Sequence, residues 1–369
     1  MRDCLEYLSD WARRIGLSEI RVDAAGNFRA VLPGRSTRRL IIGSHLDTVP
    51  QAGAFDGVLG VAMGMAIAES LVGQPPSCTL ELVGFSEEEG VRFARPFIGS
   101  IAFVRGLDQD FLDLVDRDGM TVRQALSDFG LDPSGSHKPL MNADSVAYLE
   151  FHIEQGPVLE SVDLALGVVG SIAGQTRAVV DFIGRANHAG TTPMHLRQDA
   201  FCAAAEWTLA VERRARECVG VVATVGSVQV SPGAGNIVPA HARLSLDLRH
   251  SADETRLHAF EDVQREGLAI AHRRGVKFSC HVILNQAAVA MDLGLVRRAE
   301  MAVAAVGVAR HYMTSGAGHD AMILAQRLPT AMIFLRSPGG ISHHPEEDVR
   351  VGDVELALKA GHLFVENFC

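Results

Sequence analysis

The feature that most constrains the fold is a short apolar strand that runs directly into residues of the kind that bind metals. Residues 40–42 are apolar on both faces, as in a strand buried inside a parallel sheet. His45 follows just past the strand's end, where open α/β sheets place their ligands. Asp47 is near enough to accept the spare ring N–H of His45, and Asp56 opens an apolar run, 57–71, that predicts a buried helix. Taken alone, the segment fits a surface histidine and a helix-capping aspartate equally well.

A second buried strand, 79–85, ends in three adjacent glutamates. Like charges this close raise one another's pKa, so either a cation neutralises them or water solvates the whole turn. By the alternation of the strand, Glu88 and Glu89 point to different sides, so that one binds a metal while the other transfers protons. The order strand, helix, strand predicts a right-handed parallel crossover, which places these glutamates at the same kind of strand end as His45.

Two further strands end in histidine. His152 lies near the end of an expected strand at 146–157, and His343 follows an expected strand at 330–335. A lone histidine in a strand is more often a core residue than a ligand. Together with the strand ends at His45 and at the glutamates, four strand ends now carry residues that can bind a metal. One metal site explains this more simply than four coincidences do. Mixed histidine and carboxylate ligands suit Zn, Mn, Co or Ni.

Composition narrows the class of protein. At 369 residues the chain is long enough for two domains. Its net charge of -10 and the lack of a basic cluster disfavour nucleic acid and anionic membrane as partners. The sequence has no uninterrupted apolar run of about 18 residues, which argues against a spanning helix. The six cysteines are scattered without a C-x-x-C pair, so we expect free thiols and a cytoplasmic protein.

The periodicity of the chain changes near Gly174 and changes back near Asn285. Between these residues, four alternating strands and two amphipathic helices predict an α+β sandwich, with Asp199 capping the first helix. We expect an inserted domain that is hinged at these two ends. The expected domains are 1–173 with 287–369, and 174–286. A polar segment, 107–142, is expected to be mobile with short helical stretches.

Together, the motifs of the chain resemble those of a known family. In order, they are GSHLDTVP with FDG, EEEGVRF, FHIEQGPVLE, ANHAGTTPM, GNIVP, SGAGHDA and GISHHPEE. They are similar to the dinuclear metal amidohydrolases, in particular the branch of N-carbamoyl-L-amino-acid hydrolase, allantoate amidohydrolase and β-ureidopropionase, which is related to aminoacylase and carboxypeptidase G. The resemblance covers nearly the whole chain. It implies an α/β fold with a zinc-aminopeptidase-like catalytic domain, in which helices flank a mixed central sheet, and an inserted α+β domain that serves as lid and dimer contact.

The resemblance implies a ligand set for two divalent metals, with zinc the first choice. The implied ligands are His45, Asp56, Glu89, His152 and His343. In this scheme Asp56 bridges the metals, His45 and His152 complete one site, and Glu89 and His343 complete the other. His152 also indicates the branch, because peptidase relatives carry a carboxylate at that position.

The resemblance assigns the remaining chemistry to polar residues near these ligands. Glu88 is implied as the general base, and His188 as the residue that stabilises the oxyanion from across a dimer. Asp47, which is expected to fix the tautomer of His45, is counted with them as catalytic. The implied substrate-binding residues are Gln155, Asn236, Arg249 and His319. Asn236 and Arg249 match the positions that hold the substrate carboxylate, and we expect lid closure to bring both onto it.

The expected activity is hydrolysis of the carbamoyl or ureido C–N bond of a small carboxylate by a cytoplasmic homodimer. N-carbamoyl amino acid and allantoate are rival substrates. An aminoacylase or dipeptidase of the same fold is the alternative enzyme, and a catalytically inactive binding homologue is the alternative outside enzymes. Retention of every ligand and of Glu88 argues against the inactive protein.

Three features depart from the family pattern. The chain begins abruptly within what resembles the family's first helix, so we expect an upstream segment to be missing. His344 stands where the family usually has a small or polar residue, and it competes with His343 for the role of ligand. Arg185, in GRANHAG, is expected to alter the rim of the pocket.

Overall fold

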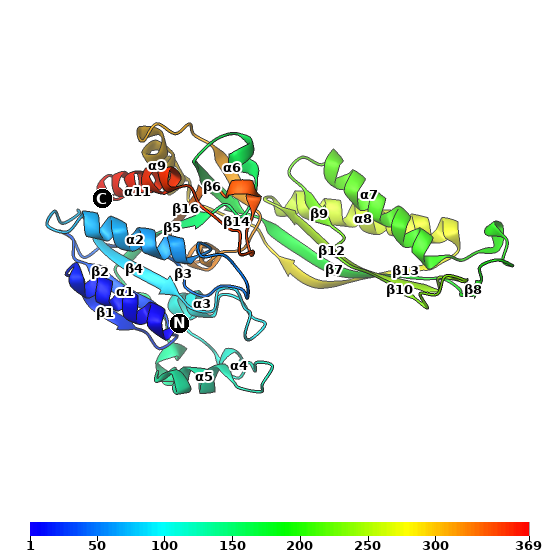
Figure 1. The fold of residues 1–369 in the computed structure, drawn as a ribbon, viewed down its shortest axis with the longest axis horizontal. Coiled ribbons are helices and arrows are strands. Elements are labelled where there is room, and N and C mark those ends of the chain that lie inside the picture. Colours follow the sequence, from blue (N-terminus) through cyan, green and yellow to red (C-terminus); the bar gives the residue numbers. More distant parts are fainter. Residues whose placement is uncertain (369) are drawn as a thin grey trace. The chain divides into compact units, whose positions relative to one another are not determined.

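The computed structural model describes residues 1–368 (Figure 1). Contacts divide the chain into two compact units. The first unit is Met1–Gly170 together with the chain from Ala290 onward, and the second unit is Ser171–Val289. The inserted domain expected over 174–286 lies inside the second unit. No helix within residues 1–368 combines the length and the apolar character needed to cross a membrane.

The first unit is built on a mixed sheet. Its strands are β1 (Ser18–Val22), β2 (Phe28–Leu32), β3 (Arg39–His45), β4 (Thr79–Phe85), β5 (Ser145–Ile153), β6 (Leu166–Ile172), β14 (Val289–Ala290), β15 (Tyr312–Ser315) and β16 (Thr330–Leu335). Its helices are α1 (Arg2–Arg14), α2 (Val58–Ser70), α3 (Ile98–Arg105), α4 (Gln109–Leu112), α5 (Val122–Phe129), α6 (Val158–Ser161), α9 (Leu293–Ala305), α10 (Asp320–Leu324) and α11 (Val351–Glu366).

The strand order of this sheet explains why the candidate residues meet. The order is β1-β2-β4-β3-β5-β16-β6-β14, with β15 paired to β6. The neighbours β4, β3, β5 and β16 are parallel, so the carboxyl ends of all of them lie at one edge. The expected parallel crossover from β3 through α2 to β4 is confirmed. Antiparallel pairs flank this core, so the sheet is mixed, as predicted.

Helices cover both faces of the central strands. A Cβ placed on Gly361 of α11 would lie 2.7 Å from the ring of Phe151 on β5, so only glycine allows this close packing. Tyr148, three residues earlier on the same strand, packs against Phe85, and Phe85 packs in turn against Phe103 of α3. Because alternate residues of a strand face opposite sides, α11 and α3 cover opposite faces.

The segment 107–142 differs from the expectation of a mobile region. Its short helical stretches are present as α4 and α5. However, Phe111, Leu112 and Val122 are buried and join Ile98 of α3 in one hydrophobic cluster. The few apolar side chains in this polar stretch were enough to fix it, because burying each one stabilises the fold by about 1.5–3 kcal/mol.

The second unit is a sheet with two helices packed on one face. Its strands are β7 (Gly174–Ile183), β8 (Asn187–His188), β9 (Val222–Thr224), β10 (Val228–Ser231), β11 (Ile237–Val238), β12 (His241–His250) and β13 (Lys277–Gln286). Its helices are α7 (Ala200–Glu217) and α8 (Asp253–Arg274). The main sheet has the order β10-β12-β7-β13, and β9 also pairs with β12. The short strands β9 and β10 therefore share one partner strand.

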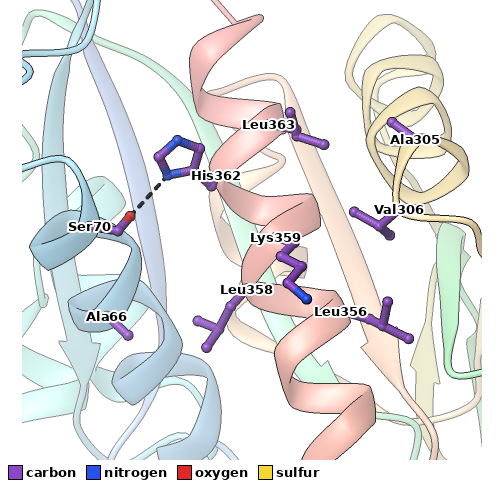
Figure 2. Close-up of a pocket in the computed structure, with 9 residues that line it drawn as sticks. All are labelled: Ala66, Ser70, Ala305, Val306, Leu356, Leu358, Lys359, His362 and Leu363. Carbon is purple, nitrogen blue, oxygen red and sulfur yellow. Dashed lines mark hydrogen bonds between the residues drawn. The ribbon is translucent and has the colours of Figure 1, made fainter.

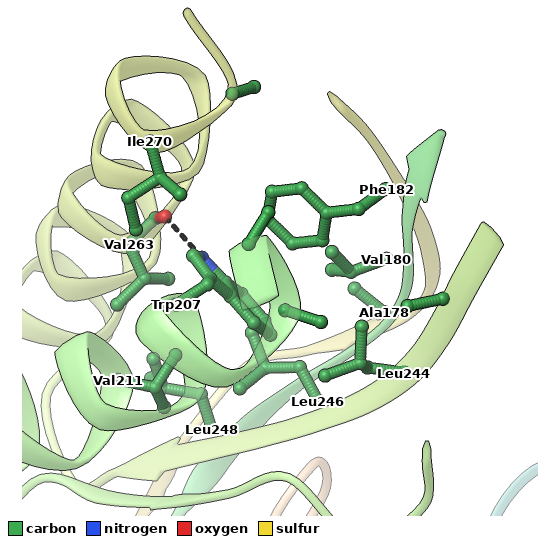
Figure 3. Close-up of a cluster of buried hydrophobic side chains, with 14 of the residues drawn as sticks. Ala178, Val180, Phe182, Trp207, Val211, Leu244, Leu246, Leu248, Val263 and Ile270 are labelled. Atoms are coloured by element: carbon green, nitrogen blue, oxygen red, sulfur yellow. Dashed lines mark hydrogen bonds between the residues drawn. The ribbon is translucent and has the colours of Figure 1, made fainter. Parts of the chain in front are cut away.

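The core of the second unit follows the alternation of β12 (Figure 3). Leu244, Leu246 and Leu248 are each 1 % exposed and face the two helices. Trp207 of α7 is fully buried among them, and its Nε1 donates to the carbonyl oxygen of Val263 on α8 at 2.8 Å. The predicted cap of α7 is also confirmed, because the Asp199 carboxylate accepts the N–H of the helix's first turn.

Candidate metal centre

His45, Asp56 and His152 meet at the carboxyl ends of β3 and β5. His45 is the last residue of β3 and not past its end, and both imidazoles are almost fully buried. The two Nε2 atoms lie 3.3 Å apart, and Asp56 Oδ1 lies 3.6 Å from His45 Nε2 and 3.1 Å from His152 Nε2. Donor atoms of the three residues all fall within 4.8 Å of one another. Asp56 does not cap α2, whose N-cap is Gly57 with no side-chain bond.

A second group of donor atoms shares Asp56. Its Oδ2 lies 3.0 Å from His343 Nε2, which lies 3.5 Å from Glu89 Oε1. One donor atom from each of these three residues falls within 4.8 Å of the others. His343 follows β16 and has a left-handed φ of 55°. The adjacent His344 is in neither group, and its Nδ1 accepts the N–H of Glu346 at 3.2 Å.

The hydrogen bonds of the two buried rings leave the Nε2 atom of each ring available to bind a cation. Nδ1 lies close to a backbone carbonyl oxygen in both rings, at 2.8 Å for His45 and 2.9 Å for His152. A carbonyl only accepts, so in the neutral form of each ring Nδ1 carries the proton and Nε2 points a lone pair toward Asp56. Within residues 1–368, Asp56 Oδ1 and Glu89 Oε1 are buried without a hydrogen-bond partner. A divalent metal bound to imidazole and carboxylate would satisfy all of these atoms.

The charges in the site also favour a bound cation. Although burial opposes it, Glu88 and Asp56 raise the pKa of His45 well above its ordinary value. Burial also opposes the shift of Asp56, yet the rings of His152, His343 and His45 hold the pKa of that carboxyl far below its usual range. Both directions mean that positive charge is stabilised between the rings and the carboxylates.

The glutamates after β4 do not follow the predicted alternation. They lie in a turn, where the period of two no longer applies, and one oxygen each of Glu88 and Glu89 lies within 4.8 Å of the other and of a ring nitrogen of His45. Both carboxylates therefore face the same centre. Glu88 is 6 % exposed, and burial raises the pKa of its carboxyl well above the ordinary value. Such a group is suited to accepting and holding a proton.

Asp47 makes a different contact from the predicted one. Its backbone carbonyl, and not its carboxylate, lies 2.8 Å from His45 Nδ1. The carboxylate instead accepts the N–H of Glu88 at 3.0 Å through Oδ1 and the N–H of Glu89 at 3.1 Å through Oδ2. The spacing alone does not separate these arrangements, because both acceptors belong to the same residue. Asp47 thus holds His45 with its main chain and the glutamate turn with its side chain.

Gln155 and His319 lie beside the two donor groups. Gln155 Nε2 donates to Asp56 Oδ2 at 2.9 Å. His319 is buried with its Nε2 2.8 Å from Ser315 Oγ, and its ring centroid is 4.4 Å from that of His152. Burial, and then the neighbouring His152, lower the pKa of His319 well below its ordinary value. Gln155 therefore contacts the shared carboxylate, and His319 packs against one of the candidate ligands.

Two buried carboxylates at the site were not predicted. Glu150 is fully buried on β5, and its Oε2 accepts the hydroxyl of Tyr148 at 3.1 Å. Glu347 is 5 % exposed and accepts the backbone N–H of Asp56 at 3.0 Å. For Glu150 the available signal was an acidic residue inside an apolar strand, which requires buried partners. For Glu347 it was the second glutamate of the GISHHPEE motif.

In the second unit, His188 and Asn236 lie together. The short strands β8 and β11 pair, and the carbonyl of Asn236 accepts the N–H of Ala189 at 2.9 Å. His188 is exposed, and its Nδ1 accepts the N–H groups of Gly190 and Thr191 at 3.1 and 3.2 Å. The neutral ring therefore carries its proton on Nε2, which leaves an N–H donor of the kind that stabilises an oxyanion.

Arg249 lies toward the other end of the same sheet. Its Nε and Nη2 donate to the Asp247 carboxylate at 2.7 and 2.8 Å. Asn236 precedes His241, where β12 begins, and the eight residue steps from His241 to Arg249 span about 27 Å at about 3.4 Å per step. Figure 1 shows β8 and β9 at opposite ends of this unit's sheet. Within one chain, Asn236 and Arg249 therefore lie too far apart to contact one small carboxylate together.

A pocket of about 570 Å³ opens between α2, α11 and the end of α9 (Figure 2). Its wall is mostly apolar, with leucine and valine side chains from the helices. The polar contact in it joins the Ser70 hydroxyl to His362 Nδ1 at 2.9 Å. None of the predicted site residues lines this pocket, so it has no part in the proposed chemistry.

Five of the six cysteines, from Cys4 to Cys280, lie among the described residues, where the prediction of free thiols can be checked. Cys4, Cys202, Cys218 and Cys280 are free thiols, as expected. Cys78 is buried in the core of the first unit. The sixth, Cys369, lies outside the described residues.

Comparison with known proteins places the chain in a family. The family described as peptidase family M20/M25/M40 matches residues 41–367. An N-carbamoyl-L-amino-acid amidohydrolase of Paenarthrobacter aurescens is 37% identical over 361 residues, covering 94% of this chain and 87% of the relative. A probable allantoate deiminase of Oryza sativa subsp. japonica is 36% identical over 394 residues, covering 96% and 80%.

A solved structure agrees with these relatives. The crystal structure of an amidase of the hydantoinase/carbamoylase family from Burkholderia multivorans superposes with a TM-score of 0.91 at 31% identity, covering 98% of this chain and 88% of that one. The likeness spans both units, and the mixed sheet flanked by helices is the fold that these proteins share. The chain therefore belongs to the M20/M25/M40 peptidase family and is a hydrolase.

Proposed function

We propose that this chain is a two-metal amidohydrolase that cleaves the carbamoyl or ureido C–N bond of a small carboxylate, with release of ammonia and carbon dioxide. The substrate is an N-carbamoyl-L-amino acid or allantoate. The observation that carries the proposal is the pair of donor groups that share Asp56, with the buried carboxyl of Glu88 beside them. The names of the similar proteins support the substrate class.

The proposal divides the ligands between two metals. His45 and His152 would hold one metal and Glu89 and His343 the other, with Asp56 between them. When bound, the metals supply a nucleophilic water at neutral pH and polarise the substrate carbonyl. Zinc is the first choice, and manganese, cobalt and nickel suit the same donors.

Glu88 moves the proton in this mechanism. A ureido nitrogen is a poor leaving group until it is protonated, so the reaction needs a group that takes a proton from the attacking water and returns it to that nitrogen. Glu88 is buried, and burial raises its pKa, which favours holding the proton between the two steps. The carboxylate of Asp47 keeps Glu88 in place through the backbone N–H.

Recognition of the substrate would need two subunits. His188 and Asn236 lie together, whereas Arg249 is about 27 Å farther along β12, so one substrate contacts all three only if separate chains supply them. We assign Arg249 to one subunit and the other two residues to its partner. An arginine fork suits the substrate carboxylate, and the Nε2–H of His188 suits the oxyanion.

A homodimer through residues 174–286 is part of the proposal. The edge strand β13 supports it, because Val282 and Ile283 on this strand are 41% and 59% exposed. Two-fold pairing of identical surfaces would produce two equal composite sites. The thiols of Cys4, Cys202, Cys218 and Cys280 support a location in the reducing cytoplasm.

The test measures release of ammonia and of free amino acid from a panel of allantoate, N-carbamoyl-L-amino acids, N-acyl amino acids and dipeptides. The protein is stripped with chelator and reloaded separately with zinc, manganese, cobalt or nickel. We expect release from a ureido substrate and none from stripped protein. Hydrolysis of N-acyl amino acids or dipeptides alone would establish the aminoacylase or dipeptidase alternative. Metal binding without turnover of any member would favour the inactive binding homologue.

A further inference from the structure

Glu347 joins two distant segments of the chain that each carry a candidate metal ligand. Its Oε1 accepts the backbone N–H groups of Phe55 and Asp56, both at 3.0 Å. Its Oε2 accepts the hydroxyl of Ser342 at 2.9 Å. Ser342 directly precedes His343 in the chain. The buried side chain of Glu347 therefore links the segment that carries Asp56 to the segment that carries His343.

The packing around Glu347 leaves it little freedom. The side chain is 5 % exposed, and a Cβ built on Gly53 would lie 2.3 Å from the Cβ of Glu347. Only glycine at position 53 lets the two segments approach this closely. The contact is thus a fixed part of the fold.

We propose that Glu347 is a positioning residue that sets Asp56 and His343 at the separation two metals require. The inference rests on the proposed function, because it concerns how the two donor groups bind metal. Asp56 belongs to both groups, so an error in its placement weakens both sites. Residues that orient metal ligands typically change metal affinity 10- to 100-fold when they are removed.

The hydrogen-bond chemistry of Glu347 predicts how its variants rank. Glu347→Gln keeps an oxygen that accepts both N–H groups, and the Ser342 hydroxyl can turn to accept from the new amide. Glu347→Ala loses every acceptor, and Glu347→Asp is one methylene too short to reach both segments. We therefore expect Gln to preserve the metal sites and Ala and Asp to weaken them.

Asp116 offers a matched control. Its Oδ1 accepts the N–H groups of Asp118 and Met120, at 3.0 and 2.9 Å, and its Oδ2 accepts from Arg92 at 3.0 Å. Its side chain is 6% exposed. Asp116→Ala therefore removes the same kind of loop-bracing carboxylate from a loop that holds no candidate ligand.

The experiment measures binding of Co²⁺ and Zn²⁺ by competition with a coloured chelator, the Co²⁺ absorption spectrum, and the melting temperature. The parent protein is measured first, and failure to bind two metals contradicts the proposed function and not the role of Glu347. In a parent that binds two, we expect Glu347→Ala to weaken metal binding roughly 10- to 100-fold and to change the Co²⁺ spectrum. Glu347→Gln and Asp116→Ala should stay within about threefold of the parent.

If Glu347→Ala does not fold, Glu347→Asp is measured in its place with the same expectation. Parent-like metal binding in the Ala or Asp variant would overturn the proposal. Weakening by Gln as large as that by Ala would also overturn it, because the acceptors for both N–H groups are then intact. If Asp116→Ala weakens metal binding as much as Glu347→Ala does, the effect comes from a general loss of stability, and this too would overturn the proposal.

Discussion

The carboxylate of Asp47 accepts the backbone N–H of Glu88 at 3.0 Å, and its second oxygen accepts the N–H of Glu89 at 3.1 Å. A turn that carries adjacent glutamates is strained by repulsion between their charges. Two charge-assisted hydrogen bonds from one carboxylate hold that turn by its main chain, which leaves both glutamate side chains available to the centre. The position of Glu88 thus depends on a residue 41 positions earlier.

We predict that Asp47→Asn lowers kcat more than it lowers stability. The amide keeps one oxygen acceptor but presents an NH₂ group to the second N–H, so one bond is replaced by two donors that face each other. We expect kcat to fall about 10- to 100-fold, as for other residues that orient a functional group. Steady-state kinetics and melting temperature measure the two effects.

Asp116→Asn is the control for this change. Asp116 also accepts two backbone N–H groups, but through a single oxygen, so the amide can keep both bonds. This variant should retain the kinetics of the parent. Unchanged kcat in Asp47→Asn would mean that the turn is held without its carboxylate.

A second prediction concerns Glu88 itself. Glu88→Gln is nearly isosteric but cannot accept a proton, so we expect kcat to fall about 10²- to 10⁴-fold. Metal content, measured by elemental analysis, should stay at the level of the parent, because the bonds of the turn involve the main chain. Turnover within a few-fold of the parent would exclude Glu88 as the base.

A third prediction concerns stability against pH in the second unit. Asp181 bonds Arg243 at 2.9 Å and His241 at 2.6 Å, and these contacts hold the pKa of its carboxyl below the ordinary value of 3.8. A lowered pKa in the folded state stabilises the protein above about pH 3.8, and this stabilisation is lost as pH falls through the folded-state pKa. At neutral pH, Asp181→Asn should therefore lower the free energy of unfolding by about 1 kcal/mol.

The measurement for Asp181 is chemical denaturation from pH 7 down to pH 3. The gap between parent and Asp181→Asn should narrow as the solution becomes more acidic. Arg243→Met, alone and combined with Asp181→Asn, isolates the contribution of the pair. A gap that stays constant over the whole range would show that the charge of Asp181 has no part in stability.

Much of this architecture was predictable because local patterns decide it. Residues 40–42 and 79–85 are apolar enough to be buried on both faces, and such strands occur almost only in parallel sheets covered by helices. The alternation of Leu244 with Arg243 and Asp247 equally fixed which face of β12 is buried. The strand ends then followed from topology, which brought His45, Asp56 and His152 together.

The failures have a common physical cause, which is that they depend on contacts between segments remote in sequence. The sequence offers the carboxylate of Asp47 a partner two residues away in His45, but in the folded protein it bonds the backbone of Glu88, 41 residues away. Glu347 finds its partners 291 and 292 residues away. The separation of Asn236 from Arg249 reflects the length of β12, which a sequence match does not measure.

That separation leads to the last prediction, which concerns subunit composition. If His188 and Asn236 serve the partner's site, each active site combines Glu88 of one chain with His188 of another. His188→Ala and Glu88→Gln homodimers should both be nearly inactive. In a mixed dimer, one site carries both lesions and the other carries neither. Random exchange makes half of the dimers mixed with one intact site each, so about a quarter of the parent activity should return.

The control replaces His188→Ala by a chain that carries both substitutions. No intact Glu88 is then present, so mixing it with Glu88→Gln should restore nothing. Native mass spectrometry establishes that exchange has occurred in both mixtures. Confirmed exchange without recovery would mean that His188 acts in its own chain or in none. In that case the 27 Å or so along β12 would exclude either Asn236 or Arg249 from contact with the substrate.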